Sequence, residues 1–455
     1  MQIEKTDLFE KAPVSKAILS LVIPTIISQI IFVIYNMADT FFIGQLGDPN
    51  QVAAATLAMP PFVLLTGIAN IFGIGGASLI SRSLGNGDKE KAKNCSAFSV
   101  WTAAIIAFLY GMVMFCFRSA VFPVLGADVS TYGFCLDYIF WTITVGAVPT
   151  VLNVCLGHLI RSEGFSRQAS AGMALGGILN MILDPIFIFG FHFEIAGAAI
   201  ATMLSNSAAT IYFLLFIVRR RKISAISVSP KHYSLKNKIP AEVLAVGLPS
   251  FLMIVLGILS SWTANKLVVS YSNQAVAGMG IAKKLDMLTF AIANGMTQGV
   301  LPLIAYNFSA KNHDRMREAI KTAFSYCLVV AVTCTILLLV FAVPISQLFI
   351  DDAETIAYAK HFLRIICITC PAISITTMII TLFQATAQKV QPTVLSILKR
   401  GVVDVFLMML MNRIVGVNGI PWATFVADIF AMLVAVCLFV PYWKSVKVNI
   451  RCEVV

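Results

Sequence analysis

Residues 18–35 read ILSLVIPTIISQIIFVIY and contain no charged side chain. A helix crosses the hydrocarbon core of a bilayer in about 20 residues, so an uncharged apolar run of this length is typical of a membrane span. The residues before it mix Glu4, Asp7 and Glu10 with lysines, and no small-residue cleavage pattern follows it. We therefore expect a retained first span rather than a cleaved signal peptide.

The composition extends this interpretation to the whole chain. The 455 residues are 58% hydrophobic and 12% charged, whereas a soluble protein carries about a quarter charged residues. Similar apolar runs recur along the sequence between short polar turns and predict an all-α integral membrane protein with twelve transmembrane helices. The expected spans are 17–41, 53–80, 95–118, 130–157, 169–190, 195–218, 241–269, 275–307, 319–343, 356–385, 392–413 and 419–443.

The positions of the charges predict the orientation of the spans. The formal net charge is +11, and the lysines and arginines gather at alternate ends of the spans. Because basic clusters face the cytoplasm, this pattern predicts a multi-pass protein of the cell membrane with both termini in the cytoplasm. It also accounts for the positive charge without a nucleic-acid partner. The clusters lie at residues 82–93, 161–167, 219–238, 311–321 and 444–451.

The chain repeats itself at an offset of about 224 residues. The stretch QVAA at 51–54 returns as QAVA at 274–277, and IAN at 68–70 returns as IAN at 292–294. Six spans per half give both halves the same orientation, so the repeats are parallel, with a pseudo-two-fold axis along the membrane normal. We expect a first lobe, a basic cytoplasmic linker that acts as a hinge, a second lobe, and a central cavity between the lobes. Their expected ranges are 1–225, 226–240 and 241–455.

Polar side chains inside the predicted spans are candidates for function, because such groups are expensive to bury in a membrane. In the first span Asp39 lies three residues after Asn36, on one helical face. In the fifth span Asn180 and Asp184 are four residues apart, and in the sixth span Thr202 offers a hydroxyl. These oxygen donors suit a hard monovalent cation, or a buried carboxylate that carries a proton.

The second half of the chain does not repeat this set. Apolar Val403 and Leu407 stand opposite the amide and the carboxylate of the fifth span, which favours a special role for the first lobe. Charges of the second lobe are expected to form local pairs, as Asp404 can with Arg400 four residues before it. The charges whose role the sequence leaves open are Lys266, Asp286 and Asp404.

Several motifs taken together resemble the multidrug and toxic compound extrusion (MATE) transporters, most closely the bacterial members. The resemblance extends over essentially the whole chain. The motifs are NMADTFFIG at 36–44, SRSLG at 81–85, LNMILDPIFIFG at 179–190, GAAIAT at 197–202 and PLIAYN at 302–307.

This resemblance implies an exporter of organic, often cationic drugs that is driven by inward flow of Na⁺ or H⁺. It also implies a cation site, because Asp39, Asn180, Asp184 and Thr202 match the positions that form one in several bacterial and archaeal members. Residues 260–264, SSWTA, lack the acidic residue that some relatives carry in the second lobe.

We therefore predict a secondary active multidrug efflux antiporter and not an enzyme, since no GxSxG or HExxH motif occurs. The drug is expected to contact Gln29, Asn36, Asn153, Phe290 and Asn294 among apolar neighbours. The coupling ion, Na⁺ or H⁺, stays open because both use the same carboxylates. We expect no cofactor, and a monomer whose partners are small organic molecules and the lipid bilayer.

The alternative is a flippase of lipid-linked oligosaccharide, which shares the duplicated plan. A cavity that holds pyrophosphate should be strongly basic, whereas the charges predicted inside the first lobe, Asp39 and Asp184, are acidic. The sequence therefore favours the antiporter over the flippase.

Overall fold

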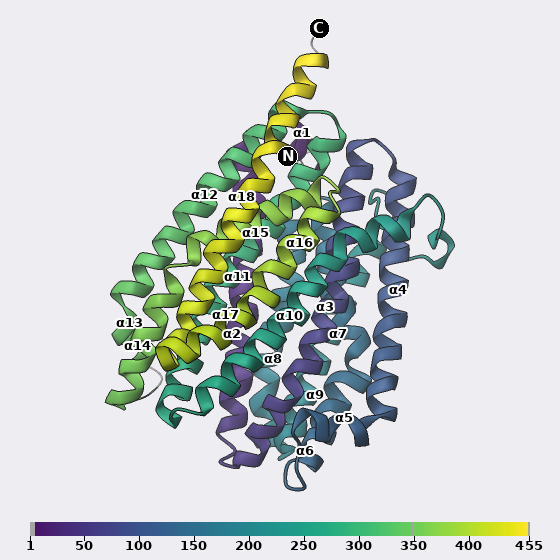
Figure 1. Cartoon of the computed structure of the whole chain (residues 1–455). Coiled ribbons are helices and arrows are strands. Elements are labelled where there is room, and N and C mark those ends of the chain that lie inside the picture. The colour runs from purple at the N-terminus through teal and green to yellow at the C-terminus, as the bar shows by residue number, and fades with distance from the viewer. Residues whose placement is uncertain (1–4, 348–349, 351, 454–455) are drawn as a thin grey trace.

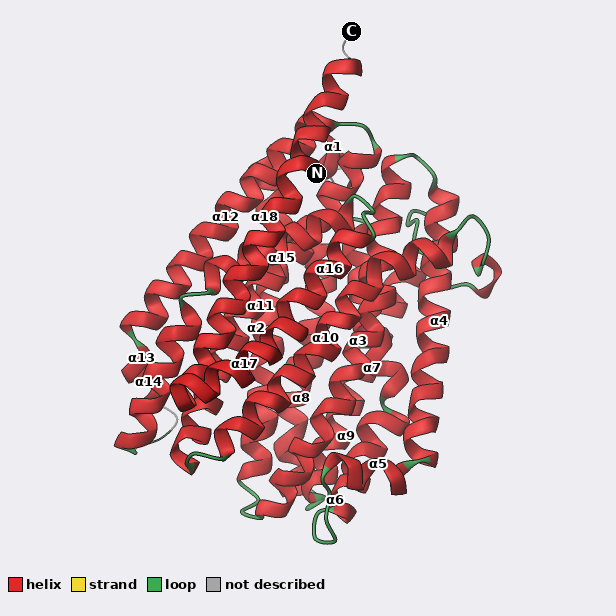
Figure 2. Ribbon diagram, in the orientation of Figure 1, coloured by secondary structure: helices red, strands yellow, loops and turns green. Residues whose placement is uncertain are grey.

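The computed structural model describes residues 5–347, 350 and 352–453. Within these residues the chain is helical and contains no β-strand (Figure 2). The long helices run side by side in one bundle, and α1 lies at the same end of the bundle as the C-terminal part of α18 (Figure 1). The all-α architecture expected from the sequence is confirmed.

The first half of the chain forms one lobe of the bundle. The predicted spans 17–41, 53–80, 169–190 and 195–218 lie within its helices, whereas 95–118 runs past the end of a helix at Cys116 and 130–157 begins two residues before a helix and includes a turn at Gly146. The elements of this lobe are α1 (Lys5–Glu10), α2 (Val14–Gly44), α3 (Pro49–Gly85), α4 (Lys89–Cys116), α5 (Arg118–Leu125), α6 (Tyr132–Ile139), the π-helix η1 (Phe140–Val145), α7 (Ala147–Ser162), α8 (Ser166–Pro185), the π-helix η2 (Ile186–Gly190) and α9 (Glu194–Arg219).

The second half forms a lobe of the same kind after a connection that contains one 3₁₀ turn. Its elements are η3 (Pro230–His232) in the connection, then α10 (Ile239–Val269), α11 (Asn273–Ser309), α12 (His313–Val340), α13 (Ala342–Gln347), α14 (Ala353–Cys367), α15 (Cys370–Ala385), α16 (Val390–Arg400), α17 (Val402–Val415), the 3₁₀ turn η4 (Gly416–Asn418) and α18 (Gly419–Glu453).

The lengths and bends of the helices show the repeat that the sequence predicted. The first three long helices contain 31, 37 and 28 residues in the first lobe and again 31, 37 and 28 in the second. The fourth span of each lobe is broken, by a bend of 50° between Val145 and Ala147 and by one of 43° between Cys367 and Cys370. Breaks at matching positions are expected of two copies of one fold, so the chain consists of two six-helix repeats.

The apolar helices account for the predicted spans. Nine helices of the described chain are long and apolar enough to cross a membrane, and eleven result when each bent pair is counted as one span. The last of these, Val390–Ser445, covers 56 residues, which would extend about 84 Å as one straight helix. This is more than twice the thickness of a bilayer core, and it includes both of the last two predicted spans.

The connection between the lobes is bound to the first lobe along much of its length. The amide of Ala225 and the hydroxyl of Ser224 both donate to the carboxylate of Glu163. The amide of Ser227 donates to Ser96 Oγ at 2.8 Å, and Trp101 Nε1 donates to the carbonyl of Val228 at 3.0 Å. The first residues of the predicted linker are therefore anchored on α4, and the residues just before it are anchored on Glu163 at the end of α7.

Helices α2 and α3 make most of the contact between the lobes: α2 packs along α11, and α3 packs along both α10 and α11. Glycine allows the backbones to approach closely. A Cβ atom at Gly75 would lie 2.2 Å from the carbonyl oxygen of Val243, and one at Gly247 would lie 2.0 Å from that of Ile71. A side chain at either position would therefore force the helices of the two lobes apart.

Polar contacts reinforce this junction at one end of the bundle. We call it the basic end, and it carries the connections 85–89, 162–166, 219–239 and 309–313. Arg82 and Lys91 of the first lobe form ion pairs with Glu242 of the second, at 3.1 and 3.0 Å. Ser78 Oγ donates to the carbonyl of Gln384 at 2.7 Å. The lobes are therefore closed against each other at the basic end.

The segment around α1 spans the same junction. Phe9 is 2% exposed, stacks on Tyr306 of the second lobe with 5.1 Å between ring centroids, and approaches Gly164 of the first lobe. The guanidinium of Arg315 donates to the carbonyls of Phe9 and Ala12, each at 2.5 Å. The N-terminal segment thus contacts both lobes where they meet.

We expect the substitution Glu242→Gln to weaken closure at the basic end about fivefold. The paired groups are partly exposed, and pairs of this kind contribute about 1 kcal/mol or less. Distances between spin labels placed on the two lobes would report the closed fraction. The matched control is Glu90→Gln, which changes an exposed glutamate in the first turn of α4. Equal closed fractions for the two variants would contradict the prediction.

Candidate functional site

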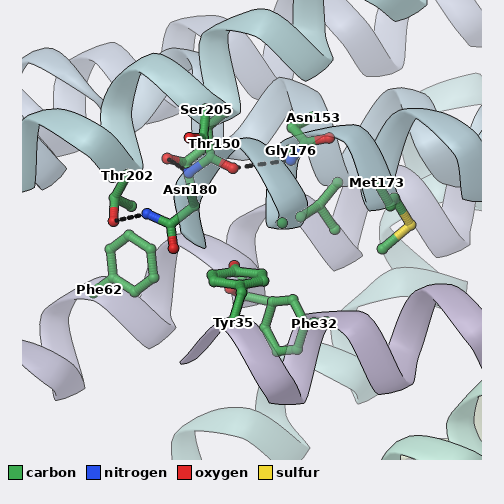
Figure 3. Close-up of a pocket in the computed structure, with 14 residues that line it drawn as sticks. Phe32, Tyr35, Phe62, Thr150, Asn153, Met173, Gly176, Asn180, Thr202 and Ser205 are labelled. Carbon is green, nitrogen blue, oxygen red and sulfur yellow. Dashed lines mark hydrogen bonds between the residues drawn. The ribbon is translucent and has the colours of Figure 1, made fainter. Parts of the chain in front are cut away.

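A pocket lies within the first lobe, among α2, α3, α7, α8 and α9, and the space in it that atoms do not fill is about 530 Å³ when its part open to solvent is included. Figure 3 shows the rings of Phe32, Tyr35 and Phe62 on one side of it and the polar groups of α7, α8 and α9 on the other. The pocket can therefore offer aromatic surface and hydrogen bonds to one ligand. Its lining residues are Phe32, Tyr35, Phe62, Thr66, Thr150, Asn153, Val154, Met173, Gly176, Gly177, Asn180, Thr202, Ser205 and Asn206.

Two glycines of α8 let its neighbours pack closely around the pocket. A Cβ atom at Gly177 would lie 2.8 Å from Ile31 and 2.9 Å from Tyr35 of α2. A Cβ atom at Gly176 would lie 3.3 Å from the Cβ of Ala209 on α9. These small residues bring α2 and α9 against α8, which positions the polar groups described next.

Asn180, Asp184 and Thr202 form one hydrogen-bonded group. Asn180 Nδ2 donates to Asp184 Oδ1 at 3.1 Å and to Thr202 Oγ1 at 3.2 Å (Figure 3 shows the second bond). The four-residue spacing places the amide and the carboxylate on one face of α8. Asp184 is fully buried, and Asn180 is 1% exposed. The structure thus brings together three of the four predicted cation ligands.

Asp39, the fourth predicted ligand, approaches this group from α2. It is 8% exposed, and Oδ2 accepts a hydrogen bond from the hydroxyl of Tyr138 at 3.4 Å. Its carboxylate is close enough to Asp184 for the two charges to interact. The sequence did not single out Tyr138, because one tyrosine in an apolar span carries no signal of its own.

The unsatisfied oxygens of these side chains fit a bound cation. Asp39 Oδ1, Asn180 Oδ1 and Asp184 Oδ2 are buried and have no hydrogen-bond partner. A buried acceptor without a donor costs about 1 to 3 kcal/mol, so several of them in one region indicate a ligand that supplies positive charge. Carboxylate, amide and hydroxyl oxygens are the donors that a hard cation prefers.

A second polar group lines the pocket nearer the middle of the lobe. Asn153 Nδ2 donates to Asn206 Oδ1 at 2.9 Å, and Asn206 Nδ2 donates to Thr150 Oγ1 at 3.1 Å. Asn153 Oδ1 has no hydrogen-bond partner and belongs to a residue that lines the pocket. Of the predicted drug contacts, Asn153 is the one that the structure places in this pocket.

The other predicted drug contacts lie elsewhere. On α2, Gln29 Nε2 donates to Gln298 Oε1 of the second lobe at 3.0 Å, and Asn36 Nδ2 donates to the carbonyl of Phe32 at 2.7 Å. Phe290 and Asn294 belong to α11 of the second lobe. Four of the five residues therefore do not line this pocket.

The second lobe buries charges of its own. Lys399 is 1% exposed, donates to Thr377 Oγ1 at 3.0 Å, and has its ammonium 5.6 Å from the ring centroid of Phe290. Asp404 is fully buried and accepts a hydrogen bond from Ser260 Oγ at 2.5 Å. The side chain of Arg400, its predicted partner, lies outside the described residues. The sequence did not reveal the burial of Lys399, since a lysine within a span can also extend its side chain to the surface.

Comparison with known proteins assigns the chain to a family. The family model described as MatE matches residues 24–186 and 249–410, which is one segment in each lobe. The chain belongs to the MATE family of membrane transporters, as its motifs suggested.

Relatives and solved structures agree with this assignment. The multidrug export protein MepA of Staphylococcus saprophyticus is 32% identical, with 96% of each chain covered. MepA of Staphylococcus haemolyticus is 30% identical, covering 97% of this chain and 96% of the relative.

Two solved structures show the same fold. An outward-facing structure of a multidrug resistance MATE family transporter has a TM-score of 0.91 at 23% identity, covering 98% of this chain and 99% of the other. A mutant of the Vibrio cholerae MATE transporter VcmN has a TM-score of 0.87 at 23% identity, covering 96% of this chain and 97% of the other.

Proposed function

We propose that the chain is a secondary active multidrug efflux antiporter, which exports organic, often cationic drugs in exchange for inward flow of Na⁺ or H⁺. The names of the 30% to 32% identical relatives support the export of multiple drugs. The single observation that carries the antiport is that Asn180 and Thr202 are predicted ion ligands and also line the pocket. They bond with each other next to Asp184, and they line the pocket.

Because the same two side chains belong to both sites, binding of the ion can change how the pocket binds the drug. Asp39, Asp184, Asn180 and Thr202 would hold Na⁺ through their oxygens, and with H⁺ a carboxylate would take the proton. Either ion adds positive charge beside the pocket and reorients the amide of Asn180. A cationic drug in the pocket would then meet repulsion and a changed hydrogen-bonding surface, so ion and drug favour different states.

Helix α2 extends the coupling beyond this amide. We call the four predicted ion ligands, Asp39, Asn180, Asp184 and Thr202, the ion group. Helix α2 carries Asp39 of this group and also Phe32 and Tyr35 of the pocket wall. A shift of α2 on ion binding therefore moves two aromatic drug contacts together. Because α2 also packs along α11 of the second lobe, the same shift reaches the junction between the lobes.

We place the basic end in the cytoplasm of the cell membrane, because basic connections stay on that side. The lobes are joined at this end, so the drug would leave toward the opposite, outer end in this state. Opening the basic end would admit the drug from the cytoplasm in the alternate state. One chain supplies both lobes, so a monomer is the expected transport unit.

The test uses purified protein in liposomes loaded with a fluorescent organic cation. A Na⁺ gradient or a proton gradient is imposed separately, and the variant Asp39→Asn is the control. Dye movement driven by one gradient and lost in the variant is the expected result, and it names the coupling ion. Folded wild-type protein that moves no dye under either gradient would overturn the proposal and direct the next assay to lipid-linked substrates.

The hydroxyl of Thr202 provides a finer test of the ion group. Thr202→Val keeps the shape of the side chain but removes the acceptor of the bond from Asn180. The substitution also removes one of the predicted oxygen ligands of the ion, and a contact to a charged group is worth about 1.5 kcal/mol or more, so the ion concentration for half-maximal export should rise about tenfold. Thr202→Ser retains the hydroxyl and should remain near wild type. Equal half-saturation for the two variants would contradict this role.

A further inference from the structure

A positive charge is buried in the first lobe near the basic end. Arg161 lies in the last turn of α7 and is 2% exposed. Its Nη1 donates to His158 Nδ1 at 3.4 Å, its Nη2 donates to Met173 Sδ at 3.6 Å, and its Nε has no hydrogen-bond partner. A guanidinium stays charged in proteins and can only donate, so His158 accepts and is the neutral tautomer.

Arg161 takes part in none of the ion pairs found within the described chain. The carboxylate of Glu163, two residues further along, accepts hydrogen bonds from Ser224 and from the amide of Ala225. The C-terminal end of α7 offers the negative end of the helix dipole, which favours a cation in the last turn but supplies only a partial charge. The surroundings of Arg161 therefore keep a net positive potential, which reaches far through a buried, weakly screened interior.

The position of Arg161 relates this potential to the pocket. Met173 contacts the guanidinium and also lines the pocket. On α7, Asn153, Gly157 and Arg161 follow one another at four-residue spacing, so they lie along one helical face. Asn153 lines the pocket, and Arg161 is about 12 Å further along the axis. The buried cation thus lies about two helical turns beyond the pocket, toward the basic end of the same lobe.

The magnitude of the effect follows from Coulomb's law. At about 12 Å and an effective dielectric constant of about 20, a unit charge disfavours a cation roughly tenfold. The barrier is higher for a cation that moves past the pocket toward Arg161, because the separation shortens while the environment stays buried. The two carboxylates attract the coupling ion into the lobe, and the guanidinium opposes its passage out of the other end.

We propose that Arg161 is an electrostatic barrier that prevents the coupling cation from leaking through the first lobe to the cytoplasm when no drug is exported. This inference rests on the proposed antiport. Arg161 touches neither ion nor drug, and it determines how many ions are admitted for each drug molecule exported. It uses a fixed positive charge to reject cations, as some membrane channels do.

The test measures ion flux through liposomes without drug. Arg161→Gln removes the charge and should raise the leak of the coupling cation about tenfold, while chloride flux stays at the wild-type level. Arg161→Lys keeps the charge and should leak no more than twice as much as wild type. A purely structural role would raise cation and chloride flux together, so a parallel rise of both in Arg161→Gln would overturn the proposal.

A second variant covers the case in which Arg161→Gln does not fold. Met173→Glu places a carboxylate beside the guanidinium, since Met173 Sδ lies 3.6 Å from Arg161 Nη2. The carboxylate balances the positive charge while the arginine stays in place. The same cation-selective leak is expected. A folded Met173→Glu or Arg161→Gln protein with wild-type cation leak would overturn the barrier. Failure of the antiport itself would be recognised separately, as absence of gradient-driven dye movement in wild type.

Discussion

Asp184→Asn should abolish gradient-driven drug export, with a loss of at least 100-fold in rate. Asp184 is fully buried, and its carboxylate provides the negative charge at the junction of the ion group and the pocket. Attraction between a carboxylate and a cation about 4 Å away is of the order of 4 kcal/mol at an effective dielectric constant near 20. Replacing the carboxylate with a neutral amide therefore weakens ion binding by two to three orders of magnitude, while the side chain keeps its size.

Export by liposomes that contain equal amounts of folded protein measures this effect. Asp39→Asn should show a loss of the same order, because the charges of Asp39 and Asp184 interact. Asp137→Asn is the matched control, since Asp137 is an exposed carboxylate of α6 beside Tyr138. Export retained at more than half of the wild-type rate in Asp39→Asn or Asp184→Asn would exclude that carboxylate from coupling.

The second large effect is expected from one methyl group at the junction of the lobes. In Gly247→Ala the new Cβ would lie 2.0 Å from the carbonyl oxygen of Ile71 and 2.6 Å from its carbonyl carbon. Backbone atoms cannot rotate away, so α10 and α3 must separate and the closed basic end is lost. We expect export to fall more than tenfold, and distances between spin labels across the basic end to lengthen.

Gly257→Ala on the same helix is the control for this substitution. A Cβ atom there would have nothing within 4 Å, and replacing glycine with alanine within a helix is favourable by about 1 kcal/mol. This variant should therefore export and close like wild type. Equal export by Gly247→Ala and Gly257→Ala would show that close packing of α3 on α10 is not required.

The sequence predicted the helices and the repeat well because membrane spans have a strong physical signature. A lipid-spanning segment must be a long apolar helix, so the runs that begin at residues 18 and 248 could be recognised individually. The repeat followed from short matches such as IAN at 68–70 and 292–294. The pairing of Asn180 with Asp184 was also predictable, since four-residue spacing on one helix fixes the geometry.

Features that depend on contacts between helices could not be predicted in the same way. The bond between Gln29 and Gln298 joins residues on different lobes, and nothing local to either glutamine indicates the other. Arg161 looked like a member of a cytoplasmic basic cluster because composition does not reveal burial, and Lys399 was missed for the same reason. The linker was expected to act as a hinge, and its basic, polar sequence does not show that Ser227 and Val228 would bond to α4.

The central claim is that ion and drug exclude each other at Asn180 and Thr202, and binding measured at equilibrium tests it most directly. The Kd of a fluorescent organic cation for purified wild-type protein is determined as Na⁺ is raised at constant pH, and as pH is lowered without Na⁺. One of these ions should raise the Kd at least tenfold, and in Asp184→Asn neither should change it more than twofold. A wild-type Kd that is independent of both ions, in protein that still exports the dye, would contradict the account.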